Sequence, residues 1–233
     1  MWTNELLRRK RRWCIWINES DVKNAQRNPF IRDRIEKVRI KRLNGNSLEQ
    51  NFVNMPYRFV QNNMPNEFQI IVPNVSTDRR KYIPIDFVKS DTVVSNLAMI
   101  LLDPQIYTFG IITSHMHVVW AKAVAGRLWE AIRYTVWLCY NTFPFPNISE
   151  KKKQLIEEHV YHILDEREKH SEKTLAELYD PDKMPQWLKQ AHEYLDEVIE
   201  KCYRATPFKN DEDRLAYLFK MYEQMIEEEK SNS

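Results

Sequence analysis

Glycine is scarce in this chain, and its scarcity excludes one common kind of site. The 233 residues include 3 glycines, too few for the glycine-rich loops that hold phosphates in nucleotide-binding proteins. The sequence also lacks the Asn/Asp-Pro-Pro-Tyr/Phe motif with which adenine methyltransferases hold a flipped base, and it lacks a nuclease-like pair of carboxylates with a lysine. We therefore expect no catalytic residue within this chain.

Cysteines and long apolar runs are few as well. Cys14, Cys139 and Cys202 are far apart, odd in number and without a Cys-x-x-Cys spacing, so neither a disulfide framework nor a zinc site is predicted. No apolar run reaches the roughly 18 residues of a membrane helix, and the basic start lacks the apolar core of a signal peptide. These absences favour a reducing cytoplasm and no membrane partner.

Charge is distributed unevenly along the chain. Residues 1–146 contain 21 Lys and Arg against 12 Asp and Glu, whereas residues 147–233 contain 14 against 21. The balance is therefore +9 in the first part and −7 in the second. A positive first part fits a surface that faces a polyanion, although solvated surface alone also produces such differences.

The first 112 residues predict one long helix and several strands. Asn28 and Pro29 are a helix cap and a first helical residue, and the helix to Leu43 should bury Ile31, Ile35, Val38 and Leu43. Its other face, which suits either phosphates or solvent, carries Arg32, Arg34, Arg39, Lys41 and Arg42. Residues 13–18, 57–61, 68–72, 82–88, 93–102 and 106–112 are β-prone and spaced as in a compact, mainly antiparallel sheet.

Residues 109–146 form a distinctive unit. A strand at 109–112 should lead into a helix that is capped by Thr113 or Ser114 and buries Met116, Val119, Trp120 and Ala123. The helix should end near Ala125 and Gly126, because glycine accepts a left-handed backbone. Residues 127–140 then predict an extended segment, which two prolines end at positions 144 and 146.

The remainder of the chain predicts helices. Ser149, Pro185 and Asp211 mark three helix starts, and the first helix should run to about His170. Apolar stripes should face inward from all three, formed by Leu155, Ile156, Val160, Ile163 and Leu164, by Leu188, Ala191, Leu195, Val198 and Cys202, and by Leu215, Leu218, Phe219, Tyr222 and Met225. The fold class is therefore α+β, a mixed and mainly antiparallel sheet with helices followed by an all-α region.

The order of these motifs resembles a known family. ITSxMHxxW, GRL, RY and YNTFPFP follow one another between residues 111 and 146, and further landmarks lie at residues 12–17, 79–87, 178–185 and 213–225. This pattern, which covers nearly the whole chain, resembles the target recognition domain of MmeI-like (type IIL) restriction-modification enzymes. These bacterial proteins fuse a type II endonuclease, an adenine-N6 DNA methyltransferase and a DNA-specificity domain.

The resemblance implies a domain division, partners and cofactors. Residues 1–146 would be the DNA target recognition domain and residues 147–233 a helical C-terminal domain. The implied partners are double-stranded DNA and the methyltransferase domain of the same parent chain. S-adenosylmethionine and Mg²⁺ would serve catalytic domains outside this sequence, and this chain would hold no cofactor or metal.

The resemblance also places the DNA-reading residues after the GRL motif. There the predicted extended segment presents Trp129, Ala131 and Arg133 on one face and Leu128, Glu130 and Ile132 on the other. The implied base-reading residues are Trp129, Glu130, Ala131 and Arg133, since arginine suits guanine and apolar groups suit thymine methyls. The phosphate candidates are Arg127 and Lys122, together with Arg79 and Arg80 before a predicted strand.

Other interpretations of these residues stay open. An ion pair inside the domain would also explain Arg133, and ordinary packing would explain Trp129. The acidic second part fits a non-enzymatic scaffold that binds another protein. A free-standing metal-dependent hydrolase would need His115, His117, His159 or His162, yet the first two diverge by roughly 200° on a helix and no third ligand lies near the other two.

Overall fold

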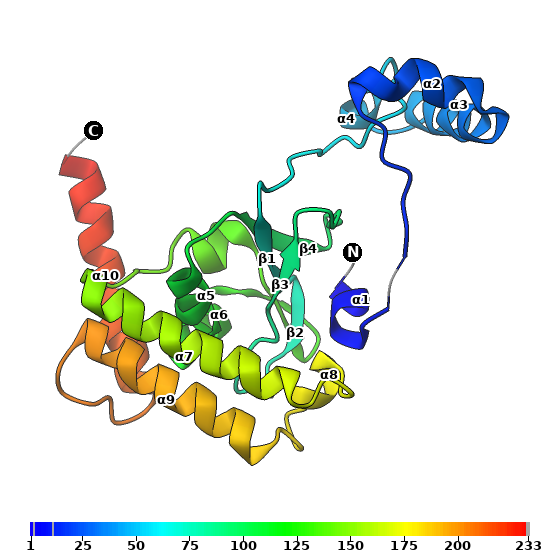
Figure 1. The fold of residues 1–233 in the computed structure, drawn as a ribbon. Helices are drawn as coiled ribbons and strands as arrows, with labels where there is room; N and C mark the ends of the chain where they lie inside the picture. The colour runs from blue at the N-terminus through cyan, green and yellow to red at the C-terminus, as the bar shows by residue number, and fades with distance from the viewer. Residues whose placement is uncertain (2, 11, 232–233) are drawn as a thin grey trace. The chain divides into compact units, whose positions relative to one another are not determined.

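The computed structural model of the chain describes residues 1, 3–10 and 12–231. The chain folds as a larger unit, residues 1–11 with 65–233, and a smaller unit, residues 12–64. Figure 1 shows the elements of both units.

The smaller unit is formed by short helices around one longer helix. The Asn28 side chain accepts hydrogen bonds from the backbone amides of Phe30 and Ile31, which confirms the predicted cap of a helix that starts at a proline. Asn46 and Glu49 form a capping box for the last helix of the unit. The elements are η1 (Glu19–Asp21), α2 (Val22–Arg27), α3 (Pro29–Leu43) and α4 (Ser47–Gln50).

A buried arginine organises this unit. Arg42 is only 7% exposed and donates to the carbonyl oxygens of Phe52 at 3.0 Å, Met55 at 2.8 Å and Arg58 at 2.7 Å. The placement of Arg42 on a face for phosphates or solvent was therefore wrong. The inward positions of Val38 and Leu43 were also wrong, because these side chains are 37% and 48% exposed.

Two predicted strands of this unit are absent from its described residues. Residues 13–18 form no regular element and residues 57–61 form turns and bends. Trp13 is 93% exposed, so the apolar residues of the first segment do not pack into a sheet. β-propensity alone does not make a strand when no neighbouring strand completes the hydrogen bonds.

The larger unit contains two small antiparallel sheets. One has the order β3-β1-β4 and the other β2-β6-β5, which confirms the predicted antiparallel pairing. β1 nearly matches the prediction at 68–72, β3 and β4 are shorter than predicted, and β2 was not predicted. The strands are β1 (Phe68–Pro73), β2 (Val75–Thr77), β3 (Asp86–Lys89), β4 (Ala98–Leu102), β5 (Gly126–Leu128) and β6 (Ala131–Arg133).

The segment predicted as a strand at 106–112 is a helix. α5 (Ile106–Thr113) is buried from Phe109 to Thr113, so its apolar residues show no helical periodicity from which the sequence could reveal it. Gly110 faces α7 (Glu150–Glu168). A Cβ atom at this glycine would lie 2.5 Å from Ile156 Cγ2, and the missing side chain thus permits close helix packing.

The next helix follows the prediction more closely. α6 (His115–Val124) is capped by Ser114, whose hydroxyl accepts from the His117 amide, and it buries Met116, Val119 and Trp120. Ala123 is exposed instead of buried. The helix ends at Ala125 as expected, although Ala125 is extended and no described glycine has a positive φ, so the predicted left-handed glycine was wrong.

The predicted C-terminal helices are confirmed. α7, α9 (Gln186–Tyr203) and α10 (Asp211–Ser231) start directly after or at the predicted positions, and α7 and α9 lie side by side (Figure 1). Ile156, Val160, Leu188, Leu195 and Leu218 are buried. Leu155 and Phe219 were predicted to face inward but are 41% and 40% exposed. Two short helices complete the unit, α1 (Thr3–Arg8) and α8 (Leu175–Leu178).

One hydrophobic core joins the sheets to the C-terminal helices. It contains Ile70, Phe109 and Trp120 from before residue 147 and Ile156 and Leu195 from after it. Buried polar contacts cross the same boundary: the Tyr82 hydroxyl donates to Asp196 Oδ2 at 2.7 Å, and the His115 amide donates to Asp196 Oδ1 at 2.7 Å. Within the described residues, no helix is long and apolar enough to cross a membrane.

Candidate nucleic-acid interface

The segment after α6 folds as a tight hairpin. β5 pairs with β6 so that Gly126 faces Arg133 and Leu128 faces Ala131, which leaves a two-residue loop of Trp129 and Glu130. The predicted extended segment is thus correct as far as Arg133, apart from this loop. It is wrong beyond it, because residues 136–140 form the π-helix η2 (Val136–Tyr140).

Trp129 lies at the tip of the hairpin in an unusual conformation. Its φ is 56°, a value that two-residue hairpin loops require at the first central position and that glycine or asparagine usually supplies. For a bulky side chain such a φ carries strain of about 1–3 kcal/mol. The side chain is 95% exposed, so burial does not explain its position.

The side chains of β6 alternate as the sequence predicted. Ile132 is 1% exposed and faces the core, whereas Arg133 is exposed and Ala131 half-buried. Among the residues that the structure describes, none forms an ion pair with Arg133, so the internal-ion-pair interpretation lacks a partner there. The guanidinium of Arg133 is available to a ligand, and Glu130 is likewise exposed.

A buried contact fixes the end of β6 on its core side. Tyr134 follows Arg133 and is 1% exposed, and its hydroxyl lies 2.7 Å from Nε2 of the buried His117 on α6. Burial lowers the pKa of His117 to about 3, so its imidazole is neutral at physiological pH. The sequence showed no sign of this contact, because the partners lie in different elements.

A second contact ties the hairpin to β2. Asp78 follows β2 and accepts from Arg127 Nη1 at 2.7 Å, and the Asp78 amide donates to the Glu130 carbonyl oxygen at 3.4 Å. Lys122 is half-buried at the end of α6; burial lowers its pKa, while Asp78 and Asp211 act in the opposite direction. The predicted phosphate candidates Arg127 and Lys122 are therefore brought together beside the hairpin, with an acidic neighbour.

Arg79 and Arg80 make contacts within the larger unit. Arg79 forms an exposed ion pair with Asp182 at 2.5 Å, and Arg80 Nε donates to the Tyr179 carbonyl oxygen at 2.9 Å. Burial lowers the pKa of Arg80. These two cations join the loop after β2 to the segment after α8.

The histidines of the alternative metal site are separate. His115 Nε2 lies 2.7 Å from Asp211 and His117 contacts Tyr134, whereas His159 and His162 lie on α7. No group of three or more His, Cys, Asp or Glu that suits a metal ion occurs among the described residues. The structure thus brings the four histidines to no common ligand set.

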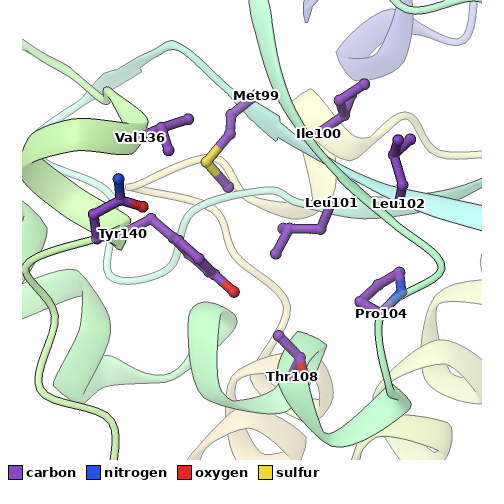
Figure 2. A pocket seen from close by; sticks show the side chains of 9 residues that line it. Met99, Ile100, Leu101, Leu102, Pro104, Thr108, Val136 and Tyr140 are labelled. Atoms are coloured by element: carbon purple, nitrogen blue, oxygen red, sulfur yellow. The ribbon is translucent and has the colours of Figure 1, made fainter. Parts of the chain in front are cut away.

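A separate shallow cavity of about 330 Å³ lies between β4, α5 and η2. Figure 2 shows Leu101, Thr108 and Tyr140 around it, with Met99 and Val136 nearby. None of its lining residues is charged. Since phosphates bind cationic groups and backbone amides, this cavity does not suit a nucleic-acid backbone.

Comparison with known proteins identifies both parts of the chain. Residues 1–147 match the family profile of the MmeI target recognition domain, and residues 148–228 match that of the MmeI C-terminal domain. The chain is 43% identical over 217 residues to DNA methyltransferase A of Bacillus subtilis (strain 168). This match covers 93% of this chain and 25% of the Bacillus protein.

A solved structure gives the same result in three dimensions. The fold matches the type IIL restriction-modification enzyme MmeI, determined in complex with DNA, with a TM-score of 0.92 and 32% sequence identity. The match covers 97% of this chain and 30% of the MmeI chain. The chain thus spans less than a third of either protein.

Proposed function

This chain belongs to the MmeI family, with the profiles of its target recognition and C-terminal domains matching nearly all residues, and we propose that it recognises a specific sequence of double-stranded DNA. In a longer protein it would direct adenine-N6 methylation and cleavage to that sequence. The observation that carries the proposal is the hairpin of β5 and β6, which presents an exposed arginine and an exposed tryptophan on a rigid support.

We assign base reading to the exposed residues of this hairpin. A two-stranded β-ribbon fits the major groove of B-DNA, where each base pair presents a distinct pattern of donors, acceptors and methyl groups. Arg133 would donate to a guanine, while Trp129, Glu130 and Ala131 would contact neighbouring base edges. Ile132 and Tyr134 would keep the strand in place from the core side.

We assign backbone contacts to the cations beside the hairpin. Arg127 would exchange its exposed ion pair with Asp78 for a phosphate, which costs little because exposed pairs contribute about 0–1 kcal/mol. Lys122 would add to the local positive potential. Arg79 would contribute in the same way, and Arg80, which is half-buried, would act through the loop that it holds.

The chemistry would belong to other parts of the longer protein. We propose that residues 1–146 recognise DNA, that residues 147–233 support them, and that a methyltransferase domain of the same polypeptide packs against this module. S-adenosylmethionine and Mg²⁺ would bind to the catalytic domains. A module without its own reaction centre needs only to hold the DNA in register, which phosphate contacts do, and to select the sequence, which base contacts do.

Replacing Arg133 by alanine tests the base-reading assignment. We expect a loss of about 1–3 kcal/mol in binding to the cognate duplex and relaxed discrimination at one base pair, because a bidentate contact to one base is removed. Binding constants for duplexes that carry each of the four pairs at every position measure both effects. Lys81→Ala is the matched control, since Lys81 is paired with Glu193 at 2.7 Å. A recognition pattern unchanged in Arg133→Ala would remove Arg133 from the reading set.

Replacing Arg127 by alanine tests the phosphate assignment. Affinity should fall about equally for cognate and unrelated duplexes, and the slope of log K against log salt should decrease by about 1, because one phosphate contact releases about one counterion. Titrations at several salt concentrations give both numbers. If the loss is confined to the cognate duplex, Arg127 reads a base and the assignment is incorrect.

A further inference from the structure

Trp129 is an exposed residue whose position packing does not explain. It combines a 95% exposed indole with a φ of 56°, so the chain carries both backbone strain and a large apolar surface in water at the same residue. Strained residues of this kind cluster at functional sites when the surrounding structure holds them in place. Here the ladder between β5 and β6 and the contact of Asp78 with Arg127 hold the loop.

The edge around Trp129 places apolar groups next to one cation. Along it the side chains are the indole, the methyl group of the half-buried Ala131 and the guanidinium of Arg133. The indole has a single N–H donor and otherwise an apolar surface, and Ala131 offers no hydrogen bond from its side chain. In the major groove, the apolar feature of a base edge is the 5-methyl group of thymine.

We propose that Trp129 contacts the 5-methyl group of a thymine in the major groove. The recognised DNA sequence would then contain a thymine near the guanine read by Arg133. 5-Methylcytosine, which carries the same methyl group at the same ring position, could replace this thymine in the contact. Cytosine and uracil lack this methyl group and would be discriminated against. The inference rests on the proposed DNA-recognition function and adds to it the class of base that the hairpin tip selects.

The experiment removes the methyl group from the DNA. Duplexes that bind the chain are first selected from a randomised pool, and the selected duplex is then synthesised with deoxyuridine at one thymine at a time. We expect the dissociation constant to rise about fourfold at one thymine, the ratio that burial of one methyl-sized group gives. At the same pair, replacing thymine by cytosine should weaken binding, and 5-methylcytosine should recover part of the loss.

Protein variants connect this effect to Trp129. In Trp129→Ala the thymine and deoxyuridine duplexes should bind equally well, whereas Trp129→Phe should retain part of the difference. Trp137→Ala is the matched control, because Trp137 is 77% exposed on η2 and should leave the fourfold ratio unchanged. Since both side chains are exposed, thermal unfolding should be nearly the same for all variants.

Different failures have different meanings. Selective binding that is insensitive to deoxyuridine at every thymine would overturn the inference but leave the proposed function intact. A methyl effect that persists in Trp129→Ala, or a selected sequence without thymine, would do the same. If no duplex is selected at all, the proposed function is overturned and the inference with it.

Discussion

Replacing Arg167 by alanine is expected to lower the free energy of unfolding of the larger unit by about 3–5 kcal/mol, the cost of breaking a buried charge network. Arg167 lies on α7 and is 5% exposed. Its guanidinium donates to the Tyr179 hydroxyl from Nε at 2.8 Å and to the Ile85 carbonyl oxygen at 3.1 Å, and it pairs with Asp86 at 3.4 Å. Burial raises the pKa of Asp86, and its half-buried carboxyl, 33% exposed, would lose its cation together with the buried Tyr179 hydroxyl and Ile85 carbonyl oxygen.

The measurement is urea-induced unfolding of the 233-residue chain followed by circular dichroism. Lys169→Ala is the matched control, because Lys169 lies two residues further on, its side chain is 64% exposed and it pairs with Glu166 within its own helix end; its effect should stay within about 0.5 kcal/mol. A loss below about 1 kcal/mol in Arg167→Ala would show that water reaches the Tyr179 hydroxyl and the Ile85 carbonyl oxygen, which are buried here.

The position of this network has a consequence for DNA recognition. Arg167 joins α7 to β3 through Asp86 and to the end of α8 through Tyr179, and the Tyr179 backbone in turn accepts from Arg80. The Tyr179 hydroxyl also lies 2.7 Å from His192 on α9. The helices after residue 147 therefore support the loop that follows β2, and the hairpin of β5 and β6, to which we assign base reading, depends on both parts of the chain.

Local signals in the sequence predicted the helices that begin at the surface. Asn28, Ser149 and Pro185 lie directly before the first residues of α3, α7 and α9, as is typical of residues at helix starts. Of the three, Asn28 caps its helix with a side-chain hydrogen bond, whereas Ser149 and Pro185 make none. The face of a helix was harder to predict. Arg42 has the composition of a surface residue, and its burial depends on three carbonyl groups supplied by a later loop.

Sequence patterns did not predict the elements that are buried on all sides. Phe109, Ile111 and Ile112 are β-prone and apolar without a helical period, and the helix that they form is decided by packing against α7 at Gly110. The site shows a similar contrast. Residues 131–133 alternate visibly, whereas the role of Asp78 and the contact of His117 with Tyr134 depend on tertiary structure that the sequence does not display.

Acidification is expected to destabilise the larger unit, because two histidines are buried as neutral imidazoles. Burial lowers the pKa of His117 to about 3 and the pKa of His192 well below 6.5. A histidine with a lowered pKa in the folded state contributes stability that is fully present above about pH 6.5 and is lost as the pH falls towards its folded value. The loss amounts to about 1.4 kcal/mol per pH unit for each histidine in that range.

Asp196 acts in the opposite direction. Burial raises its pKa from 3.8 to about 6, so its contribution is fully present below about pH 4 and is lost as the pH rises through about 6. Between about pH 4 and 6, the change of the unfolding free energy with pH that Asp196 contributes cancels the change contributed by about one of the two histidines. Taken together, these three groups should give a slope near that of a single buried histidine, and Asp86, whose pKa burial also raises, acts in the same direction as Asp196.

Two variants separate these contributions in urea unfolding between about pH 7 and 4.5. His117→Gln retains a polar partner for the Tyr134 hydroxyl and removes the titration, so the free energy of unfolding should depend less on pH. Asp196→Asn removes the offset and should make the dependence steeper by about 1.4 kcal/mol per pH unit between about pH 6 and 4.5. Equal slopes in all three proteins would mean that neither His117 nor Asp196 is protected from water.

Protonation of His117 should loosen the hairpin of β5 and β6, to which we assign base reading, before the whole chain unfolds. His117 holds β6 through Tyr134, the residue that follows Arg133, and a protonated imidazole cannot stay in this apolar site. Loosening β6 should cost sequence discrimination first, because base contacts need a fixed side chain, while backbone affinity depends mainly on charge. The ratio of cognate to unrelated binding should therefore fall in the wild type as the pH drops from about 6.5 towards the folded pKa of about 3, and it should fall less in His117→Gln.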